Sequence, residues 1–279
     1  MFGMLDVIIA AIMGIVQGIT EWLPVSSGGH LMLLQRVLPM DVSAEFWNLF
    51  EVVIQLGSIL AVVVLYFQRL NPFSSSKSAE KRRETWQLWL KIIIAVIPSG
   101  VVGILLNDWI EARLNSIVVV AVALIVYGVV FLFIDRISFV NRSHRISRTA
   151  HISYKTAFLI GCFQVLALIP GTSRSGSTII GALLLGLGRT AAVRFSFYMA
   201  IPTMLGASLL KCLKFVLGGG VMTGQELTIL AVGTATAFFV SLLVIRELVH
   251  YVRTHTFKAF GVYRILLGVI VLALAYAWR

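Results

Sequence analysis

The chain has 279 residues, of which 59% are hydrophobic and only 13% are charged, and its formal net charge is +11. An ordinary soluble domain is about 25% charged, so this composition excludes one, and the high hydrophobicity excludes intrinsic disorder. Six prolines and two cysteines exclude collagen-like and disulfide-stapled chains. The remaining class is an all-α, polytopic integral membrane protein.

The first apolar stretch, Met4 to Gln35, is too long for a single membrane span of roughly 20 residues. It is interrupted by the polar sequence LPVSSGGH, from Leu23 to His30. Each half forms a short helix, so we expect a re-entrant hairpin, in which two short helices enter and leave the membrane on one side. The residues from Met1 to Leu5 are not basic and no convincing cleavage site follows, which argues against a removable signal peptide.

Six transmembrane helices and a second broken stretch follow in the chain. Three spans come first: Phe50 to Gln68, Leu88 to Leu106 and Ser116 to Ile134. The second re-entrant hairpin is expected from Thr156 to Leu187, with its break PGTSRSGST at Pro170 to Thr178. Three further spans are Phe195 to Leu217, Leu227 to Ile245 and Ala259 to Trp278.

The two halves of the chain resemble each other. The segment Gly14-Ile-Val-Gln17, with Pro24 beyond it, is echoed about 147 residues later by Gly161-Cys-Phe-Gln164 with Pro170 beyond it. Each half has one broken stretch and three spans, and because three is odd, the second half is inverted. We therefore predict one membrane domain of two repeat halves, 1–145 and 150–279, whose breaks meet near the midplane. Chance similarity between hydrophobic helices is the alternative.

The basic residues indicate the orientation in the membrane, because cytoplasmic loops carry an excess of lysine and arginine. Most of the 23 basic residues flank four loops: Arg69, Lys77, Lys81, Arg82, Arg83 and Lys91; Arg136, Arg142, Arg145, Arg148 and Lys155; Arg189 and Arg194; and Arg246, Arg253, Lys258 and Arg264. With these loops inside, both termini lie outside, and the two hairpins enter from opposite faces. Since the basic excess lies between spans, no nucleic acid partner is expected.

The first break carries groups that need an explanation at membrane depth. Gln17 and Glu21 are four residues apart and share a helical face. A charge there costs about 2.5–3.5 kcal/mol, which a cation, a metal ion or water must offset. An interfacial carboxylate or a structural ion pair is the alternative. Glu51 lies near the outer end of its span, where water could solvate it.

Ser26, Ser27 and His30 follow within the same break, and with Glu21 they offer a nucleophile and a general acid or base. A serine that caps the next helix and a hydrogen-bonded spectator histidine are the simpler interpretations.

The second break surrounds Arg174 with hydroxyl groups and bare backbone N–H groups, just before an apolar helix. Helix N-termini favour anions, and a guanidinium group adds two-pronged donors for phosphate. These residues therefore predict an anion site, and a simple helix break is the alternative. The neighbours concerned are Gly171, Thr172, Ser173, Ser175, Gly176, Ser177 and Thr178.

Residues 14–30 (GIVQGITEWLPVSSGGH) and 170–178 (PGTSRSGST) closely resemble the two signatures of the bacterial undecaprenyl-diphosphate phosphatase family, also called the bacitracin-resistance (BacA) family. Residues 50–58 and 161–170 also resemble it, so the resemblance covers essentially the whole chain. It implies removal of the terminal phosphate of undecaprenyl diphosphate, which regenerates the lipid carrier for cell-wall synthesis and confers bacitracin resistance. It also implies a divalent metal ion (Mg²⁺ or Ca²⁺) and a bacterial inner membrane location with the site facing the periplasm. A homo-oligomer is left open.

By this resemblance, Glu21 takes the metal and acid position, with Gln17 as a second metal ligand, and Arg174 clamps the diphosphate. Ser27 attacks phosphorus while His30 or Glu21 takes its proton, and His30 as the nucleophile is the variant. Ser26, Gly171, Ser173, Ser175, Gly176 and Thr178 support phosphate binding.

Two positions bear on the number of metal ligands, although the family motif accepts either Glu or Gln at the position of Gln17. Gln17 leaves one carboxylate on its face, and Gly28 stands where a hydroxyl residue is common. The rival class is a transporter or flippase of a phosphorylated polyprenyl lipid, since inverted repeats with broken helices are also a transporter architecture. A serine beside a histidine and a glutamate favours an enzyme.

Overall fold

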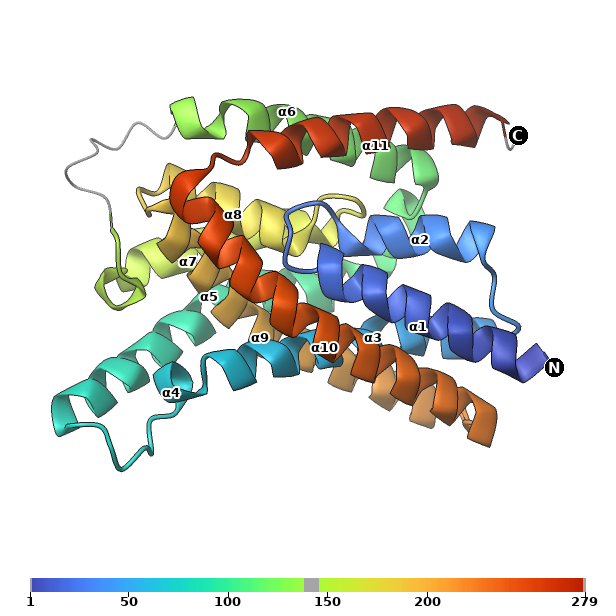
Figure 1. Ribbon diagram of the computed structural model, residues 1–279, viewed down its shortest axis with the longest axis horizontal. Helices are drawn as coiled ribbons and strands as arrows, with labels where there is room; N and C mark the ends of the chain where they lie inside the picture. The colour runs from blue at the N-terminus through green and yellow to red at the C-terminus, as the bar shows by residue number, and fades with distance from the viewer. Residues whose placement is uncertain (1, 138–145, 278–279) are drawn as a thin grey trace. The chain divides into compact units, whose positions relative to one another are not determined.

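The computed structural model describes residues 2–137 and 146–277, which are mostly helical (Figure 1). The long helices are α1 (Phe2–Thr20), α3 (Ala44–Leu65), α5 (Ala79–Leu114), α6 (Ile117–Ile137), α9 (Arg189–Leu217), α10 (Gly224–Thr254) and α11 (Lys258–Ala277). The short helices are α2 (Ser27–Val37), α4 (Phe67–Leu70), α7 (Tyr154–Val165) and α8 (Arg174–Leu184), with 3₁₀ turns at Thr149–His151 and Leu166–Leu168. The predicted all-α class is confirmed.

Seven of the described helices are long and apolar enough to cross a membrane, one more than the six predicted. The additional helix is α1, predicted as the first arm of the first hairpin, whose apolar stretch Gly3–Thr20 is by itself long enough to span. Large apolar side chains such as Ile104, Leu209 and Leu243 are exposed on the long helices. Such surfaces are typical of helices that contact lipid, so the chain is a multi-pass membrane protein.

Several helices extend beyond the predicted spans, because the prediction counted only apolar residues. Helix α5 begins at Ala79 instead of Leu88, since the Ser78 side chain caps it by accepting a hydrogen bond from the Lys81 N–H at 3.3 Å. Helix α10 continues to Thr254 instead of Ile245. The predictions for Arg142, Arg145, Trp278 and Arg279 lie outside the described residues.

Both breaks are shorter than predicted. Gly28, Gly29 and His30 belong to α2, and Arg174 is the first residue of α8 instead of lying inside a loop. The reason is that each loop closes at a serine, Ser26 or Ser173, and the polar residues after it continue as helix.

The two breaks share two features of their local structure. Helices α2 and α8 have 11 residues each, and they begin at positions 147 apart, the spacing of the sequence repeat. The residues just before them, Ser26 and Ser173, have φ angles of 75° and 76°. No other non-glycine residue in the described part of the chain has a positive φ. This shared geometry supports the internal repeat, while its inversion stays a prediction.

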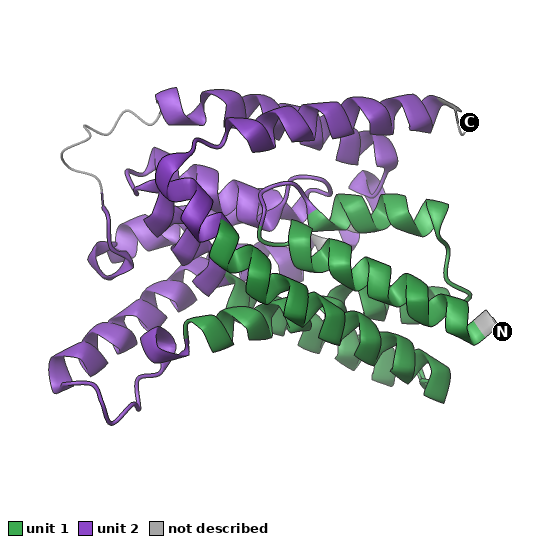
Figure 2. Cartoon of the chain, viewed as in Figure 1, with its two compact units in different colours: residues 1–22, 27–66, 200–247 green, residues 23–26, 67–199, 248–279 purple. Residues whose placement is uncertain are grey.

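The chain forms two compact units, each containing helices from both sequence halves (Figure 2). Unit 1 comprises residues 1–22, 27–66 and 200–247, and unit 2 comprises residues 23–26, 67–199 and 248–279. The units therefore do not coincide with the predicted repeat halves, which stay a prediction.

In unit 1, α1 packs closely against α10. A Cβ atom built on Gly14 would lie 2.5 Å from the Gly233 carbonyl oxygen, and one on Gly18 would lie 2.9 Å from that of Ala237. Small residues allow such close approach, the usual way in which membrane helices pack. This packing fixes the end of α1, which carries Gln17 and is followed directly by Glu21.

In unit 2, α6 and α11 lie side by side (Figure 1). A Cβ atom on Gly261 would come 2.7 Å from the Gly128 carbonyl oxygen. Helix α7 packs against α5 and α8, and α8 also contacts α6. Residues Ser175 to Leu183 of α8 are buried in consequence, so the second break is held rigidly at the start of a buried helix.

Candidate active site

The end of α1 brings an amide and a carboxylate together. Gln17 is fully buried and Glu21 is 4% exposed. The Nε2 atom of Gln17 donates a hydrogen bond to Oε2 of Glu21 at 3.0 Å. The shared helical face predicted for these residues is therefore present in unit 1.

Ser27 lies against the same carboxylate. Its hydroxyl group donates a hydrogen bond to Oε2 of Glu21 at 2.7 Å. His30 is half-buried one turn further along α2, three residues after Ser27 and so on the same helical face. Ser26 is buried in the preceding turn. A hydroxyl group bonded to a carboxylate is the arrangement that an adjacent base needs to activate a nucleophile.

A second carboxylate, that of Glu51 on α3, lies beside α2. A Cβ atom built on Gly28 would lie 3.9 Å from Oε1 of Glu51. Glu51 is not among the predicted site residues, because water could solvate a charge near the end of a span. Its single signal was a charge within an otherwise apolar run.

The first break has oxygen atoms that suit a hard divalent cation as ligands. Oε1 of Gln17 is buried and has no hydrogen-bond partner among the described residues. It adds a neutral oxygen next to the Glu21 carboxylate, and Mg²⁺ and Ca²⁺ prefer oxygen ligands. No group of three or more His, Cys, Asp or Glu side chains suited to a metal occurs in residues 2–137 and 146–277. An ion held by Gln17 and Glu21 would need further ligands from phosphate and water, as is usual for Mg²⁺.

The second break is built on Gly171 and Ser173. Gly171 has a φ of 88°, and a Cβ atom there would lie 2.6 Å from the Val120 carbonyl oxygen. The Ser173 side chain caps α8 by accepting a hydrogen bond from the Gly176 N–H at 3.1 Å. The first N–H groups of a helix have no partner within it, so this end of α8 is a suitable anion site.

Arg174 is half-buried at the start of α8, and α9 positions it. Its Nη1 atom donates to the Ser196 carbonyl oxygen at 2.8 Å. The Thr178 hydroxyl group, fully buried, donates to the Arg174 carbonyl oxygen at 2.9 Å and lies 2.6 Å from the Ser196 hydroxyl group. Thr178 therefore links α8 to α9 at Ser196, whose carbonyl oxygen holds the Arg174 guanidinium group. Ser196 could not be predicted from the sequence, because a lone serine in an apolar helix has no local signature.

The loop between Leu23 and Ser26 belongs to unit 2, together with the second break. The hydroxyl group of Ser175 lies 3.2 Å from that of Ser173 and donates to the Leu23 carbonyl oxygen at 3.3 Å. Arg264 also lies here, fully buried, within the stretch that the sequence predicts as the span Ala259 to Trp278. Its place one turn inside α11 concealed this role in the sequence.

The predicted site residues thus fall into two groups. Gln17, Glu21, Ser27 and His30 belong to unit 1, and Arg174 with its neighbours belongs to unit 2. The structure describes each group by itself. That both groups serve one headgroup stays a prediction.

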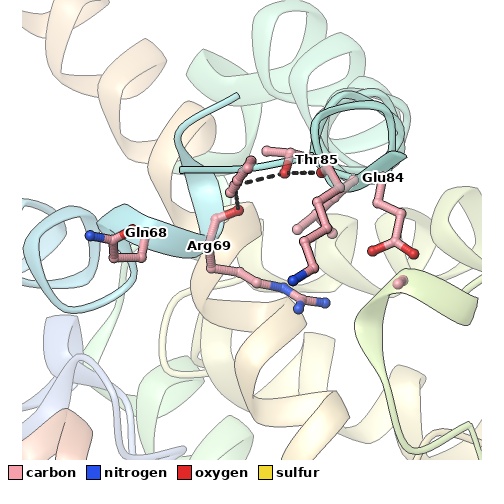
Figure 3. A pocket seen from close by; sticks show the side chains of 8 residues that line it. Gln68, Arg69, Glu84 and Thr85 are labelled. Atoms are coloured by element: carbon pink, nitrogen blue, oxygen red, sulfur yellow. Dashed lines mark hydrogen bonds between the residues drawn. The ribbon is translucent and has the colours of Figure 1, made fainter. Parts of the chain in front are cut away.

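A cavity of about 350 Å³ in unit 2 contains none of the predicted site residues (Figure 3). It is lined by Gln68, Arg69, Lys77, Lys81, Glu84, Thr85, Leu88 and Ala150. The Lys77 ammonium group donates to the carbonyl oxygens of Arg69 and Asn71 and to the Thr85 hydroxyl group. Burial, and then the charge of Arg69, lower the pKa of Lys77. Lys77 thus serves to close the turn between α4 and α5.

Comparison with known proteins gives one consistent result. Residues 10–270 match the family described as bacitracin resistance protein BacA. An undecaprenyl-diphosphatase of Limosilactobacillus fermentum is 54% identical over 270 residues, covering 97% of this chain and 98% of its own length. A relative with the same description from Lactobacillus delbrueckii subsp. bulgaricus is 51% identical and covers 96% of this chain and 97% of its own length. Another, from Lactiplantibacillus plantarum, is 52% identical and covers 96% of this chain and 98% of its own length.

Proposed function

Because the chain belongs to the bacitracin resistance protein BacA family, we propose that it is an undecaprenyl-diphosphatase that removes the terminal phosphate of undecaprenyl diphosphate. The observation that carries the proposal is the 2.7 Å hydrogen bond from the Ser27 hydroxyl group to the Glu21 carboxylate. A binding site alone needs no activated hydroxyl group, whereas an enzyme that forms a covalent phosphoserine does.

In the first step, Oγ of Ser27 attacks the terminal phosphorus atom, and Glu21, within hydrogen-bond reach, takes the Ser27 proton. The bond from that phosphorus to the bridging oxygen breaks, and undecaprenyl phosphate leaves. The proposal therefore takes Glu21 as the base, of the two candidates, Glu21 and His30, that the sequence left open. His30, on the same face of α2, is placed to protonate a leaving oxygen.

In the second step, water attacks phosphorus in the phosphoserine intermediate. The bond to Oγ of Ser27 breaks, phosphate leaves and Ser27 regains a proton. Glu21 first passes the Ser27 proton to the departing undecaprenyl phosphate. It then accepts a proton from the attacking water and returns it to Oγ of Ser27, so the protein ends as it began.

Arg174 and the start of α8 stabilise the negative charge that phosphoryl transfer spreads over the equatorial oxygens. Gln17 and Glu21 would hold a divalent ion, and that ion would supply further neutralisation of diphosphate charge when bound. The site opens toward the outside of the bacterial plasma membrane, and the polyprenyl tail lies in the bilayer.

The test uses purified full-length protein in detergent, where no second compartment exists for transport. We expect phosphate release from farnesyl or undecaprenyl diphosphate, and loss of release when divalent ions are chelated. No release in detergent, together with movement of a phosphorylated lipid in sealed vesicles, would establish the transporter alternative instead.

The nucleophile is tested with Ser27→Ala. We expect turnover to fall by about three orders of magnitude or more, because the attacking oxygen is lost. Ser43→Ala is the matched control, since it also removes a hydroxyl group at the start of a helix, where Ser43 caps α3, and it should retain turnover. Acid-quenched wild-type protein should carry an acid-stable phosphoserine; an acid-labile phosphohistidine at His30 would make His30 the nucleophile.

A further inference from the structure

Arg264 is a fully buried charged residue of unit 2, and its guanidinium group lies among backbone carbonyl groups. Its side chain is fully buried in α11. An arginine within a membrane span is costly, and such residues are usually functional. Its partners therefore indicate what it does.

The guanidinium group of Arg264 binds both breaks at once. Nη1 donates to the Pro24 carbonyl oxygen of the first break at 2.9 Å. Nη2 donates to the carbonyl oxygens of Gly171 at 2.9 Å and Thr172 at 3.1 Å, in the second break. Longer contacts of 3.4 Å reach the carbonyl oxygens of Ala123 and Leu124 on α6. One rigid, planar cation therefore joins two loops that are about 147 residues apart.

From these contacts we infer that Arg264 is a positioning residue, which holds the Pro24 loop and the Gly171–Thr172 loop in one fixed arrangement for phosphoryl transfer. This inference rests on the proposed function. Ser27 follows the first loop, and Arg174 follows the second, so each active group begins at a loop that Arg264 holds. A misplacement of about 1 Å in such groups lowers rates by about a hundredfold.

Electrostatics add a second contribution. Backbone carbonyl oxygens of a broken helix carry partial negative charge, which disfavours an anion near them. Arg264 binds three of these carbonyl groups, all of them neutral, so its own charge is not cancelled by them. Nη1 also lies 3.4 Å from where a Cβ atom of Gly176 would stand, next to the anion-binding end of α8. Arg264 thus favours an anion at that end.

The test compares Arg264→Lys with Arg189→Lys. Arg189 lies in the same unit and forms a 2.6 Å ion pair with Asp135, away from both breaks, so it is the matched control. Lysine at position 264 keeps the charge but lacks the planar set of donors. Two quantities are measured on each full-length protein: backbone hydrogen exchange by mass spectrometry, and kcat and KM for farnesyl diphosphate.

For Arg264→Lys we expect faster exchange in residues 23–26 and 171–173 together, and kcat lower by about ten- to a hundredfold with KM within about twofold. The control should show neither change. Faster exchange in only one break, a uniform increase along the chain, or an unchanged kcat would overturn the inference.

A second variant covers failure of Arg264→Lys to fold. The Tyr127 ring lies 5.5 Å from the Arg264 guanidinium carbon, so Tyr127→Leu removes one support of the side chain and leaves Arg264 in place. Faster exchange in both breaks supports the inference, and unchanged exchange overturns it. If the wild type releases no phosphate, the proposed function fails, while hydrogen exchange still decides whether Arg264 joins the two loops.

Discussion

At the scale of single residues, Gln17 shows how a neutral side chain can tune a charged site. Its amide group donates to Glu21 and leaves a buried oxygen without a hydrogen-bond partner in the described structure. As a ligand of the proposed metal ion, that oxygen would add no second negative charge. The site therefore holds one carboxylate on the α1 face instead of two.

Gln17→Glu tests this arrangement. It places two carboxylates within hydrogen-bonding distance, so we expect tighter binding of the activating divalent ion and lower thermal stability without it. Titrating activity with Mg²⁺ should give half-maximal activity at a lower concentration than in the wild type. An unchanged metal dependence would contradict a metal ion at this face.

Gly171 is tightly packed, whereas Gly28 has open space around it, and this difference gives a second prediction. Gly171→Ala puts a methyl group 2.6 Å from the Val120 carbonyl oxygen at a positive φ, so we expect a loss of several kcal/mol of stability. Gly28→Ala meets nothing closer than 3.9 Å within a helix, and should be neutral or stabilising by about 0.5–1 kcal/mol. Thermal unfolding in detergent measures both, and equal midpoints would refute the assignment of Gly171 to a strained, packed turn.

At the scale of elements, the same device occurs twice: a serine of positive φ followed by an 11-residue helix. A non-glycine residue in this conformation costs about 1–2 kcal/mol, and such strain clusters at functional sites. The serine of positive φ reverses the chain direction just before the short helix begins. The first N–H groups of that helix therefore face the break instead of a preceding turn.

Two substitutions of Ser173 distinguish the energy of the helix cap from the energy of the backbone strain. Ser173→Ala removes the cap of α8 and keeps the strain, so we expect about 1 kcal/mol of destabilisation. Ser173→Gly removes the cap and the strain together, so it should be the more stable variant by about 1 kcal/mol. The order of the two unfolding midpoints is the measurement; the reverse order would show that the φ of Ser173 is not strained.

At the scale of the whole molecule, α1 decides the topology. If it is a hairpin arm, six spans leave both termini on the outside; if it crosses, seven spans place the termini on opposite sides. Helices α2, α7 and α8, at 11 or 12 residues, are about 16–18 Å long and too short to cross.

Cysteine labelling resolves this question. Cys162 and Cys212 are replaced by serine, and Met4→Cys and Tyr276→Cys, both at exposed positions, are introduced singly. A membrane-impermeant maleimide added to intact cells should label both variants, because the basic loops favour outside termini. Labelling of only one would show that α1 crosses the membrane.

The all-helical membrane class, the two breaks, the repeat spacing, and the pairing of Gln17 with Glu21 could be predicted from the sequence, because hydrophobic length and helical periodicity are local properties. The same locality explains the errors. A count of apolar residues cannot distinguish a span from a long hairpin arm, as with α1, or detect a helix that extends into polar residues, as with α5.

Contacts between distant segments could not be predicted. The tertiary structure alone placed Ser196 under Arg174, Glu51 beside Gly28, and Arg264 among the carbonyl groups of both breaks. A serine in an apolar helix and an arginine one turn inside a helix have no local signature, since their partners lie 22 to 240 residues away. The sequence by itself determined which chemical groups enter the membrane, because solvation acts on each segment alone; packing decided which groups they bind, because that depends on the whole chain.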